Sequence, residues 1–122
     1  MRIISGKYKG LRLKFNKTVQ LRPTKDRVKE SLFSMLGDIC DNAICLDLFA
    51  GTGALGLEAI SRGAKYIDFV DVDCSIVKSN LNLIKDFSAY QVHKIKAEKF
   101  LKVTTKKYDL IFIDPPWNIP EY

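Results

Sequence analysis

One stretch of this sequence, Asp47-Leu48-Phe49-Ala50-Gly51-Thr52-Gly53-Ala54-Leu55-Gly56, contains the glycine pattern G-x-G-x-x-G. The stretch joins an apolar run that predicts a strand to a run that predicts a helix. In that context the glycines permit a tight turn and bring backbone N–H groups close to a ligand. Asp71 lies twenty residues after Gly51, at the end of the next predicted strand, where a carboxylate can accept hydrogen bonds from ribose hydroxyls. The combination predicts a site for a nucleoside-bearing cofactor, because glycines that merely turn a strand into a helix leave Asp71 unexplained.

On both sides of this stretch, short apolar runs alternate with amphipathic ones. The apolar runs predict strands, and the runs between them predict helices. Such alternation predicts right-handed crossovers and a parallel sheet with helices on its faces, so the expected fold class is α/β. The expected strands are 44–49, 66–70, 90–95 and 110–113, and the expected helices are 55–61, 76–86 and 98–103.

The last expected strand, Leu110-Ile111-Phe112-Ile113, is apolar throughout, as is typical of a strand buried on both faces. Only nine residues follow it. We therefore expect either an exposed sheet edge or a chain that is a piece of a larger protein.

Composition narrows the class of protein. The chain has 122 residues, 47% of them hydrophobic and 28% charged, which is typical of one globular domain. No apolar run approaches the roughly 20 residues of a membrane span, and the N-terminus has no apolar leader, so we expect a cytoplasmic protein. Three cysteines without a C-x-x-C pair, and a single distant His93, argue against a zinc site; Cys45, inside an apolar run, is expected to be a buried structural residue.

Positive charge is concentrated near the N-terminus. The net charge is +6, and residues 1–30 hold ten basic side chains against Asp26 and Glu30. Residues 2–15 predict a hairpin with a basic polar face, and we assign residues 1–20 to this segment and residues 21–122 to the α/β domain. A helix is expected from Lys25 to about Gly37, with Thr24 as its N-cap. Its expected apolar face is formed by Val28, Leu32, Met35 and Leu36. Such charge suits a phosphate backbone, and a merely solubilising hairpin is the alternative.

Two further features distinguish between classes of nucleoside cofactor. Asp47 lies inside the first expected strand, where its carboxylate would repel the pyrophosphate of a dinucleotide but tolerate a positively charged sulfonium. Asp114-Pro115-Pro116-Trp117 follows the fourth expected strand, at the edge where open α/β sheets place their chemistry. The first feature favours S-adenosylmethionine over NAD, and the second marks a candidate catalytic motif.

Asp-Pro-Pro followed by an aromatic residue resembles the catalytic motif of S-adenosylmethionine-dependent methyltransferases that modify exocyclic amines of bases. The stretches LRPTKDRVKE at 21–30 and LDLFAGTGALGLEA at 46–59, with RIISGK at 2–7, resemble the RsmD family. The resemblance extends over nearly the whole chain. It implies a Rossmann-like methyltransferase sheet with an N-terminal hairpin and helix, and methyl transfer to the N2 amine of a guanine in 16S ribosomal RNA.

The resemblance also implies roles for particular residues. Asp114 would accept the N–H groups of the target amine, and Trp117 would stack on the base. Methyl transfer depends on alignment more than on acid or base strength. The implied cofactor residues are Asp47, Phe49, Ala50, Gly51, Thr52, Gly53, Asp71 and Ala97; the implied catalytic residues are Asp114, Pro115, Pro116 and Trp117; the implied RNA-binding residues are Arg2, Lys7, Lys9, Arg12, Arg22, Thr24 and Arg27.

The sequence departs from the family pattern in places. Lys96 precedes Ala97 where relatives usually carry Asp or Asn, and Trp117 stands where Tyr or Phe is usual. The family's sheet continues beyond the Asp-Pro-Pro-aromatic motif, so we expect this chain to hold its first four strands. The expected partner is 16S ribosomal RNA or an assembling small ribosomal subunit, and the expected state is a monomer. Two alternatives stay open: a noncatalytic RNA-binding fragment or remnant, and a NAD-dependent oxidoreductase.

Overall fold

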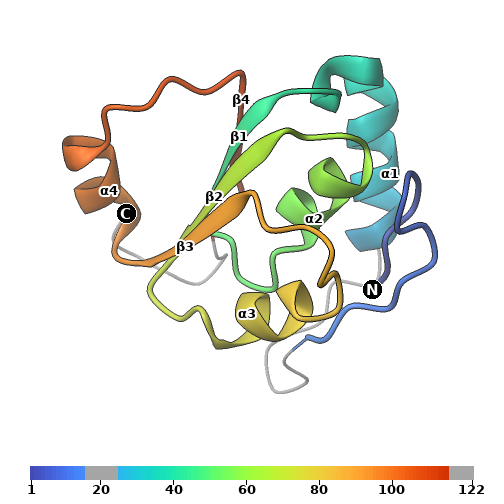
Figure 1. Ribbon diagram of the computed structural model, residues 1–122, viewed down its shortest axis with the longest axis horizontal. Coiled ribbons are helices and arrows are strands. Elements are labelled where there is room, and N and C mark those ends of the chain that lie inside the picture. Colours follow the sequence, from blue (N-terminus) through green and yellow to red (C-terminus); the bar gives the residue numbers. More distant parts are fainter. Residues whose placement is uncertain (16–24, 116–122) are drawn as a thin grey trace.

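The computed structural model describes residues 1–15 and 25–115 and has a parallel sheet at its centre (Figure 1). The strand order is β3-β2-β1-β4, so the chain starts in the interior of the sheet and adds strands on both sides. All pairings between these strands are parallel. The strands are β1 (Ile44–Leu48), β2 (Tyr66–Asp71), β3 (Tyr90–Lys94) and β4 (Leu110–Ile113), which confirms the four expected strands to within one residue at each end.

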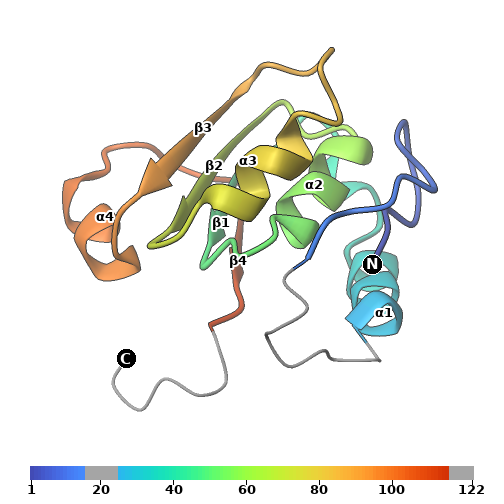
Figure 2. The same ribbon diagram turned by 90° about the horizontal axis from the view of Figure 1, so that it is seen from below.

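Helices cover both faces of the sheet (Figures 1 and 2). The first three helices lie on one face and the fourth lies on the other, as expected of right-handed crossovers. The helices are α1 (Lys25–Leu36), which continues into the 3-10 turn η1 (Gly37–Cys40), α2 (Ala54–Ser61), α3 (Ser75–Leu81) and α4 (Ala97–Val103). The α/β fold class predicted from the sequence is confirmed.

The alternation of side chains along the strands divides the core between the two faces. Cys45, Ile67 and Phe69 belong to the buried cluster that includes α1, α2 and α3. Leu46 and Val70 point to the opposite face and pack with Phe100 of α4. The three cysteines are buried and reduced, as expected for Cys45, and burial raises the pKa of its thiol to about 12.

The buried face of α1 is only partly the one that the apolar spacing predicts, because Leu32 and Leu36 pack against the buried cluster but Val28 and Met35 do not. Val28 is 61% exposed and Met35 is 86% exposed, whereas Phe33 and Lys29 are buried. Phe33 packs against Phe112 of β4 with ring centroids 5.6 Å apart. Lys29 can turn inward because its ammonium lies 3.2 Å from the buried carboxylate of Glu58. A charge with a buried partner overrides the hydrophobic pattern here.

Helix α3 is shorter than expected, because it ends at Leu81 rather than near residue 86. Tight turns follow it: the N–H of Leu83 donates to the Asn80 carbonyl, and the N–H of Ile84 donates to the Leu81 carbonyl. These i to i+3 bonds narrow the spiral and carry Ile84 into the core, where it is 1% exposed.

Strand β4 forms one edge of the described sheet, and only one of its faces is covered. Phe112 is buried toward α1, but Ile111 is 46% exposed and Ile113 is 65% exposed. The expectation of a strand buried on both faces is therefore wrong for the described residues, in which β4 is an exposed edge. Within the same residues, no helix is long and apolar enough to cross a membrane.

The N-terminal segment doubles back on itself and packs on α2. Its antiparallel pairing is limited to a bridge between Arg2 and Arg12, flanked by a 2.9 Å bond from the N–H of Ile3 to the Leu11 carbonyl. Ile3 and Leu13 join the same buried cluster as the helices. The predicted hairpin therefore exists as a tight loop rather than as two regular strands.

Candidate functional site

The glycine loop between β1 and α2 turns sharply because several of its residues have left-handed backbone conformations. Gly51 has φ 58°, Gly53 has φ 83°, and Phe49, which carries a side chain, has φ 63°. A Cβ at Gly53 would lie 2.6 Å from Val77 of α3. Gly53 is therefore required both by the turn and by the close approach of α3.

Asp47 supports this loop from inside the sheet. Its side chain is 1% exposed, and its Oδ2 accepts a 3.0 Å hydrogen bond from the N–H of Gly56 in the first turn of α2. A carboxylate at the start of a helix is favoured by the helix dipole. The described contact of Asp47 thus holds the loop and α2 to β1.

Asp71, at the end of β2, reaches directly to the glycine loop. One carboxylate oxygen accepts a 2.7 Å bond from the N–H of Gly51, and the other accepts a 2.7 Å bond from the N–H of Val72. A carboxylate has about four lone-pair sites, so both oxygens can accept further donors. Asp71 is half-buried, and a Cβ built on Gly51 would meet no atom within 4 Å. The two residues on which the nucleoside prediction depends are therefore adjacent and accessible.

The remaining residues predicted to bind the cofactor surround the same strand ends. Ala50 is buried, and Ala97 is half-buried at the first residue of α4, after the exposed Lys96. Thr52 is half-buried, and its carbonyl accepts a 2.8 Å bond from Nδ2 of Asn80. Asn80 is fully buried in α3, and its side chain also bonds the backbone N–H and carbonyl of Lys14.

Asn80 thus joins the glycine loop to the N-terminal segment. Sequence reasoning missed it, because an Asn in an amphipathic helix has no pattern that distinguishes it from a solvated residue.

Asp114 directly follows β4, the strand beside β1. Because Ile113 pairs with Leu48, Asp114 lies at the same edge of the sheet as Phe49 and the glycine loop. Asp114 is half-buried and Pro115 is exposed. The other predicted site residues, Pro116, Trp117, Arg22 and Thr24, lie outside the described residues.

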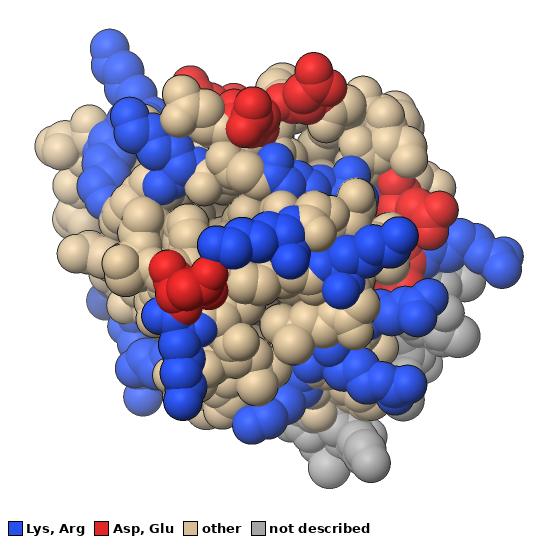
Figure 3. Space-filling model, turned by 45° about the vertical axis from the view of Figure 1, so that its right-hand side comes forward, with Lys and Arg blue, Asp and Glu red and all other residues tan. Residues whose placement is uncertain are grey.

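The basic residues predicted to bind RNA are exposed where the structure describes them. Figure 3 shows Lys and Arg side chains spread over the side that carries the N-terminal segment and α1. Lys7 is paired with Asp86 at 2.7 Å, and this hydrogen bond raises the pKa of Lys7. The described set is Arg2, Lys7, Lys9, Arg12 and Arg27.

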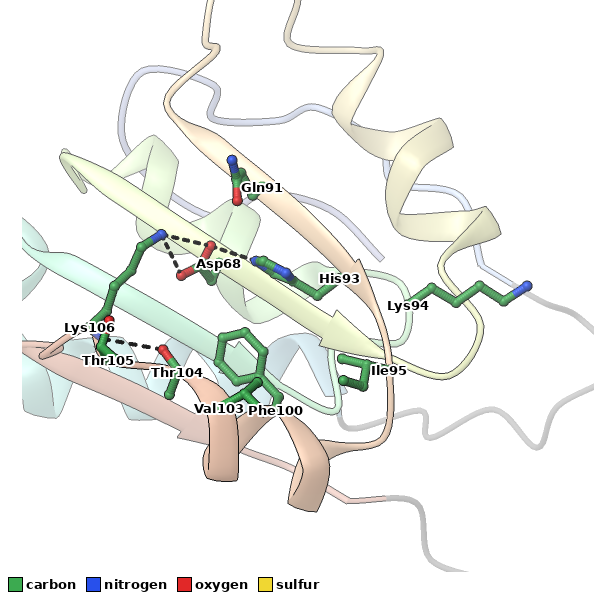
Figure 4. A pocket seen from close by; sticks show the side chains of 10 residues that line it. All are labelled: Asp68, Gln91, His93, Lys94, Ile95, Phe100, Val103, Thr104, Thr105 and Lys106. Atoms are coloured by element: carbon green, nitrogen blue, oxygen red, sulfur yellow. Dashed lines mark hydrogen bonds and ion pairs between the residues drawn. The ribbon is translucent and has the colours of Figure 1, made fainter.

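A second polar cluster, centred on Asp68, was not predicted from the sequence. Asp68 is fully buried on the α4 face of β2. It accepts hydrogen bonds from the hydroxyls of Tyr66 at 2.7 Å and Tyr108 at 2.6 Å, from His93 Nε2 at 2.9 Å and from the Lys106 ammonium at 3.1 Å. Figure 4 shows His93 and Lys106 converging on Asp68 beside a cavity of about 460 Å³.

The hydrogen bonds in this cluster decide its ionisation. Burial by itself would raise the pKa of Asp68, but the donors around the carboxylate outweigh burial and lower the pKa below its ordinary value. Burial and the bond to Asp68 raise the pKa of Tyr108 to about 12. Asp68 is therefore a permanent anion at neutral pH that fixes residues 104–108 to the sheet. Within the described residues, no group of three or more His, Cys, Asp or Glu could hold a metal ion.

Fold and glycine loop together define a Rossmann-like α/β domain of the kind found in methyltransferases. The solved Escherichia coli protein "Putative methyltransferase yhhF" resembles it with a TM-score of 0.85 and 38% identity, over 97% of this chain and 65% of that one. The family model described as "Conserved hypothetical protein 95" matches residues 1–122. The chain belongs to this family, the RsmD family, as its sequence motifs predict.

Two relatives illustrate the similarity. "Putative rRNA methyltransferase YlbH" of Bacillus subtilis is 45% identical over 97% of this chain and 67% of its own length. "Ribosomal RNA small subunit methyltransferase D" of Escherichia coli K12 is 39% identical over 97% of this chain and 61% of its own length. The chain thus spans about two thirds of the length of these relatives.

Proposed function

We propose that this chain forms the cofactor-binding part of an S-adenosylmethionine-dependent methyltransferase that acts on the N2 amine of a guanine in 16S ribosomal RNA. The observation that carries the proposal is the contact between Asp71 and Gly51, at the sheet edge where Asp114 follows the neighbouring strand. The names of the relatives support a ribosomal RNA substrate. We expect the protein to act in the cytoplasm, where small ribosomal subunits assemble.

The described residues fit this cofactor. Gly51 leaves open space above the loop, and Asp71 presents a half-buried carboxylate to a ribose. Val72, the next residue, is 58% exposed and offers an apolar surface for a nucleobase. The residues proposed to hold the cofactor are Asp47, through its support of the loop, and Phe49, Ala50, Gly51, Thr52, Gly53, Asp71 and Ala97.

When bound, S-adenosylmethionine would supply an activated methyl group on a sulfonium. The task of the chain is then to position a guanine amine, whose lone pair is delocalised into the ring. Asp114 can accept an N–H of that amine, which orients the lone pair and stabilises the positive charge that develops on nitrogen. Pro115, Pro116 and Trp117 would form the wall on which the base stacks.

The N-terminal segment, residues 1–20, is proposed to hold the RNA, and residues 21–122 the cofactor and target base. Arg2, Lys9 and Arg12 are exposed on a loop whose backbone is fixed to α2, so the backbone that carries these charges does not have to be ordered on binding. Phosphate contacts of this kind supply affinity and orientation rather than sequence specificity. The affinity for RNA should therefore fall steeply as salt concentration rises.

Calorimetric titration with S-adenosylmethionine, S-adenosylhomocysteine and NAD tests the cofactor class. The informative variant is Asp71→Asn, which can keep an acceptor for the N–H of Gly51 but loses the charge, and which puts a donor in place of the oxygen that accepts the N–H of Val72. Asp73→Asn is the matched control, because Asp73 is an exposed neighbour whose Oδ1 bonds Ser75 and survives the change.

We expect both adenosyl ligands to bind the unchanged chain and the control, and to bind Asp71→Asn at least tenfold more weakly, which corresponds to about 1.4 kcal/mol. Binding of NAD alone would overturn the proposal in favour of an oxidoreductase. RNA binding without any cofactor binding would favour a noncatalytic RNA-binding fragment.

A further inference from the structure

A second basic surface lies on the opposite side of the sheet from the N-terminal segment. Residues 94–107 contain six lysines and a single acidic residue, Glu98. All six lysines are exposed. Residues 31–122 together have a slightly negative net charge, so their net charge does not reveal the local concentration of lysines. The surface, here called the α4 lysine surface, consists of Lys94, Lys96, Lys99, Lys102, Lys106 and Lys107.

The fold arranges these lysines along one helix and its two ends. Lys94 ends β3, and Lys96 directly precedes the first residue of α4. Lys99 and Lys102 are three residues apart in α4, so they share one side of the helix. The buried residue of α4 is Phe100, which faces the sheet. The lysines of α4 are therefore directed away from the core.

One lysine of this surface is already engaged. The Lys106 ammonium bonds Asp68 at 3.1 Å and the Tyr66 hydroxyl at 2.9 Å, and these bonds raise the pKa of Lys106. Among the described residues, no other lysine of the α4 lysine surface takes part in an ion pair within 4.0 Å. Lys106 thus fixes the loop after α4, while Lys99 and Lys102 keep their charge available to a partner.

The composition of the surface indicates what kind of partner it fits. Lysine is depleted at protein–protein interfaces and is a common point-charge ligand for phosphate. With Lys106 paired to Asp68, the five other exposed lysines, with Glu98 as the one acidic residue of 94–107, create a positive potential that attracts polyanions. The arrangement therefore favours a nucleic acid backbone over an acidic protein.

We propose that the α4 lysine surface is a second contact for the phosphate backbone of RNA, on the side of the sheet opposite the N-terminal segment. Figures 1 and 2 show α4 and the N-terminal segment on opposite sides, with the ends of the strands between them. RNA held on both sides would cross the edge that carries Asp71 and Asp114. The inference rests on the proposed RNA substrate and adds a contact to it.

Fluorescence anisotropy with a labelled single-stranded RNA tests the proposal on the intact chain. The test variant is Lys99→Ala with Lys102→Ala, and the matched control is Lys65→Ala, an exposed lysine just before β2 at the other end of the sheet. Loss of two phosphate contacts should lower the slope of log affinity against log salt by about 1.4, and weaken binding about 25-fold near 0.1 M salt. The double variant Lys99→Arg with Lys102→Arg keeps both positive charges and should bind RNA with the affinity and the salt slope of the unchanged chain.

An affinity and a salt slope equal to those of Lys65→Ala would overturn the proposal, as would failure of the unchanged chain to bind RNA. If the α4 lysine surface binds an acidic protein instead, the double lysine variant would bind RNA as the control does. Equal urea midpoints for all variants would show that the fold is intact. S-adenosylmethionine titration of the unchanged chain tests the proposed function separately, since RNA binding can lose its α4 contact while cofactor binding is retained.

Discussion

Replacing Glu58 by Gln is expected to destabilise the folded chain strongly, although the two side chains have nearly the same shape. Glu58 is fully buried in α2, and its carboxylate lies 3.2 Å from the Lys29 ammonium and 2.8 Å from Nε of Arg62. It also accepts bonds from the N–H groups of Ile4 at 2.9 Å and Ser5 at 3.1 Å. A single side chain therefore joins α1, α2 and the N-terminal segment.

The magnitude follows from what the substitution leaves behind. Lys29 is 3% exposed, so a neutral Gln would leave its ammonium buried without a counter-ion. One side-chain oxygen would also become an amide nitrogen, which cannot accept the bonds of its two donors. Removing one partner of a buried ion pair costs about 3–5 kcal/mol. Proteins of this size have a total stability of roughly 6–18 kcal/mol, so the loss is a large share of it.

Urea unfolding followed by circular dichroism measures this effect. Glu30→Gln is the matched control, because Glu30 is an exposed residue of the neighbouring helix α1. The double variant Glu58→Gln with Lys29→Met removes both charges, and we expect it to recover at least half of the loss. If Glu58→Gln and Glu30→Gln unfold at the same urea concentration, the buried ion pair does not stabilise the chain and the reasoning is wrong.

Three further outcomes can be checked by similar means. Hydrogen bonds lower the pKa of Asp68 in the folded state, so its contribution to stability is complete above the pKa of the unfolded state and is lost as pH falls. Below about pH 4, acid should therefore destabilise the unchanged chain more than it destabilises Asp68→Asn, as measured by thermal unfolding. Gly56→Ala should cost roughly 1–3 kcal/mol in urea unfolding, because its Cβ would lie 2.3 Å from the ring of Phe69. Burial, with a thiol pKa of about 12, should make Cys45 unreactive toward a disulfide reagent until urea unfolds the chain, and rapid labelling of Cys45 in the folded state would contradict its placement in the core.

The regular part of the fold follows from the sequence because its signals are local. Strands β1, β2 and β4 are mostly apolar, β3 alternates Tyr90 and Val92 with polar residues, and the glycine loop combines its pattern with the correct strand and helix on either side. The face of α1 could be predicted only in part, since Leu32 and Leu36 do pack against the core. Its apolar spacing identifies Val28 and Met35, but the partner that turns Lys29 inward is Glu58, which is distant in sequence.

The polar residues of the sheet also differ in whether the sequence alone could identify them. Asp71 was predicted because its spacing from Gly51 belongs to a known pattern, and its role in binding stays a prediction. The Asp68 cluster was missed because its donors, Tyr66, His93, Lys106 and Tyr108, lie 2 to 40 residues away along the chain. The register of β2 and β3 brings His93 to Asp68, and the loop between α4 and β4 brings Lys106 and Tyr108. Asp68 inside an apolar strand was the available signal, because an unpaired buried carboxylate is too costly to keep.

Glu58 and Asp68 perform equivalent tasks on opposite faces of the sheet. The N-terminal segment is held by apolar packing of Ile3 and Leu13 and also by directional bonds to Glu58. Residues 104–108 are held in the same way by bonds to Asp68. Each carboxylate accepts four donors, two of them from the segment that it holds. The two clusters share no residue, so the effects of Glu58→Gln and Asp68→Asn on stability should add to within about 0.5 kcal/mol. A non-additive result would mean that the two carboxylate clusters are coupled energetically through the sheet that lies between them.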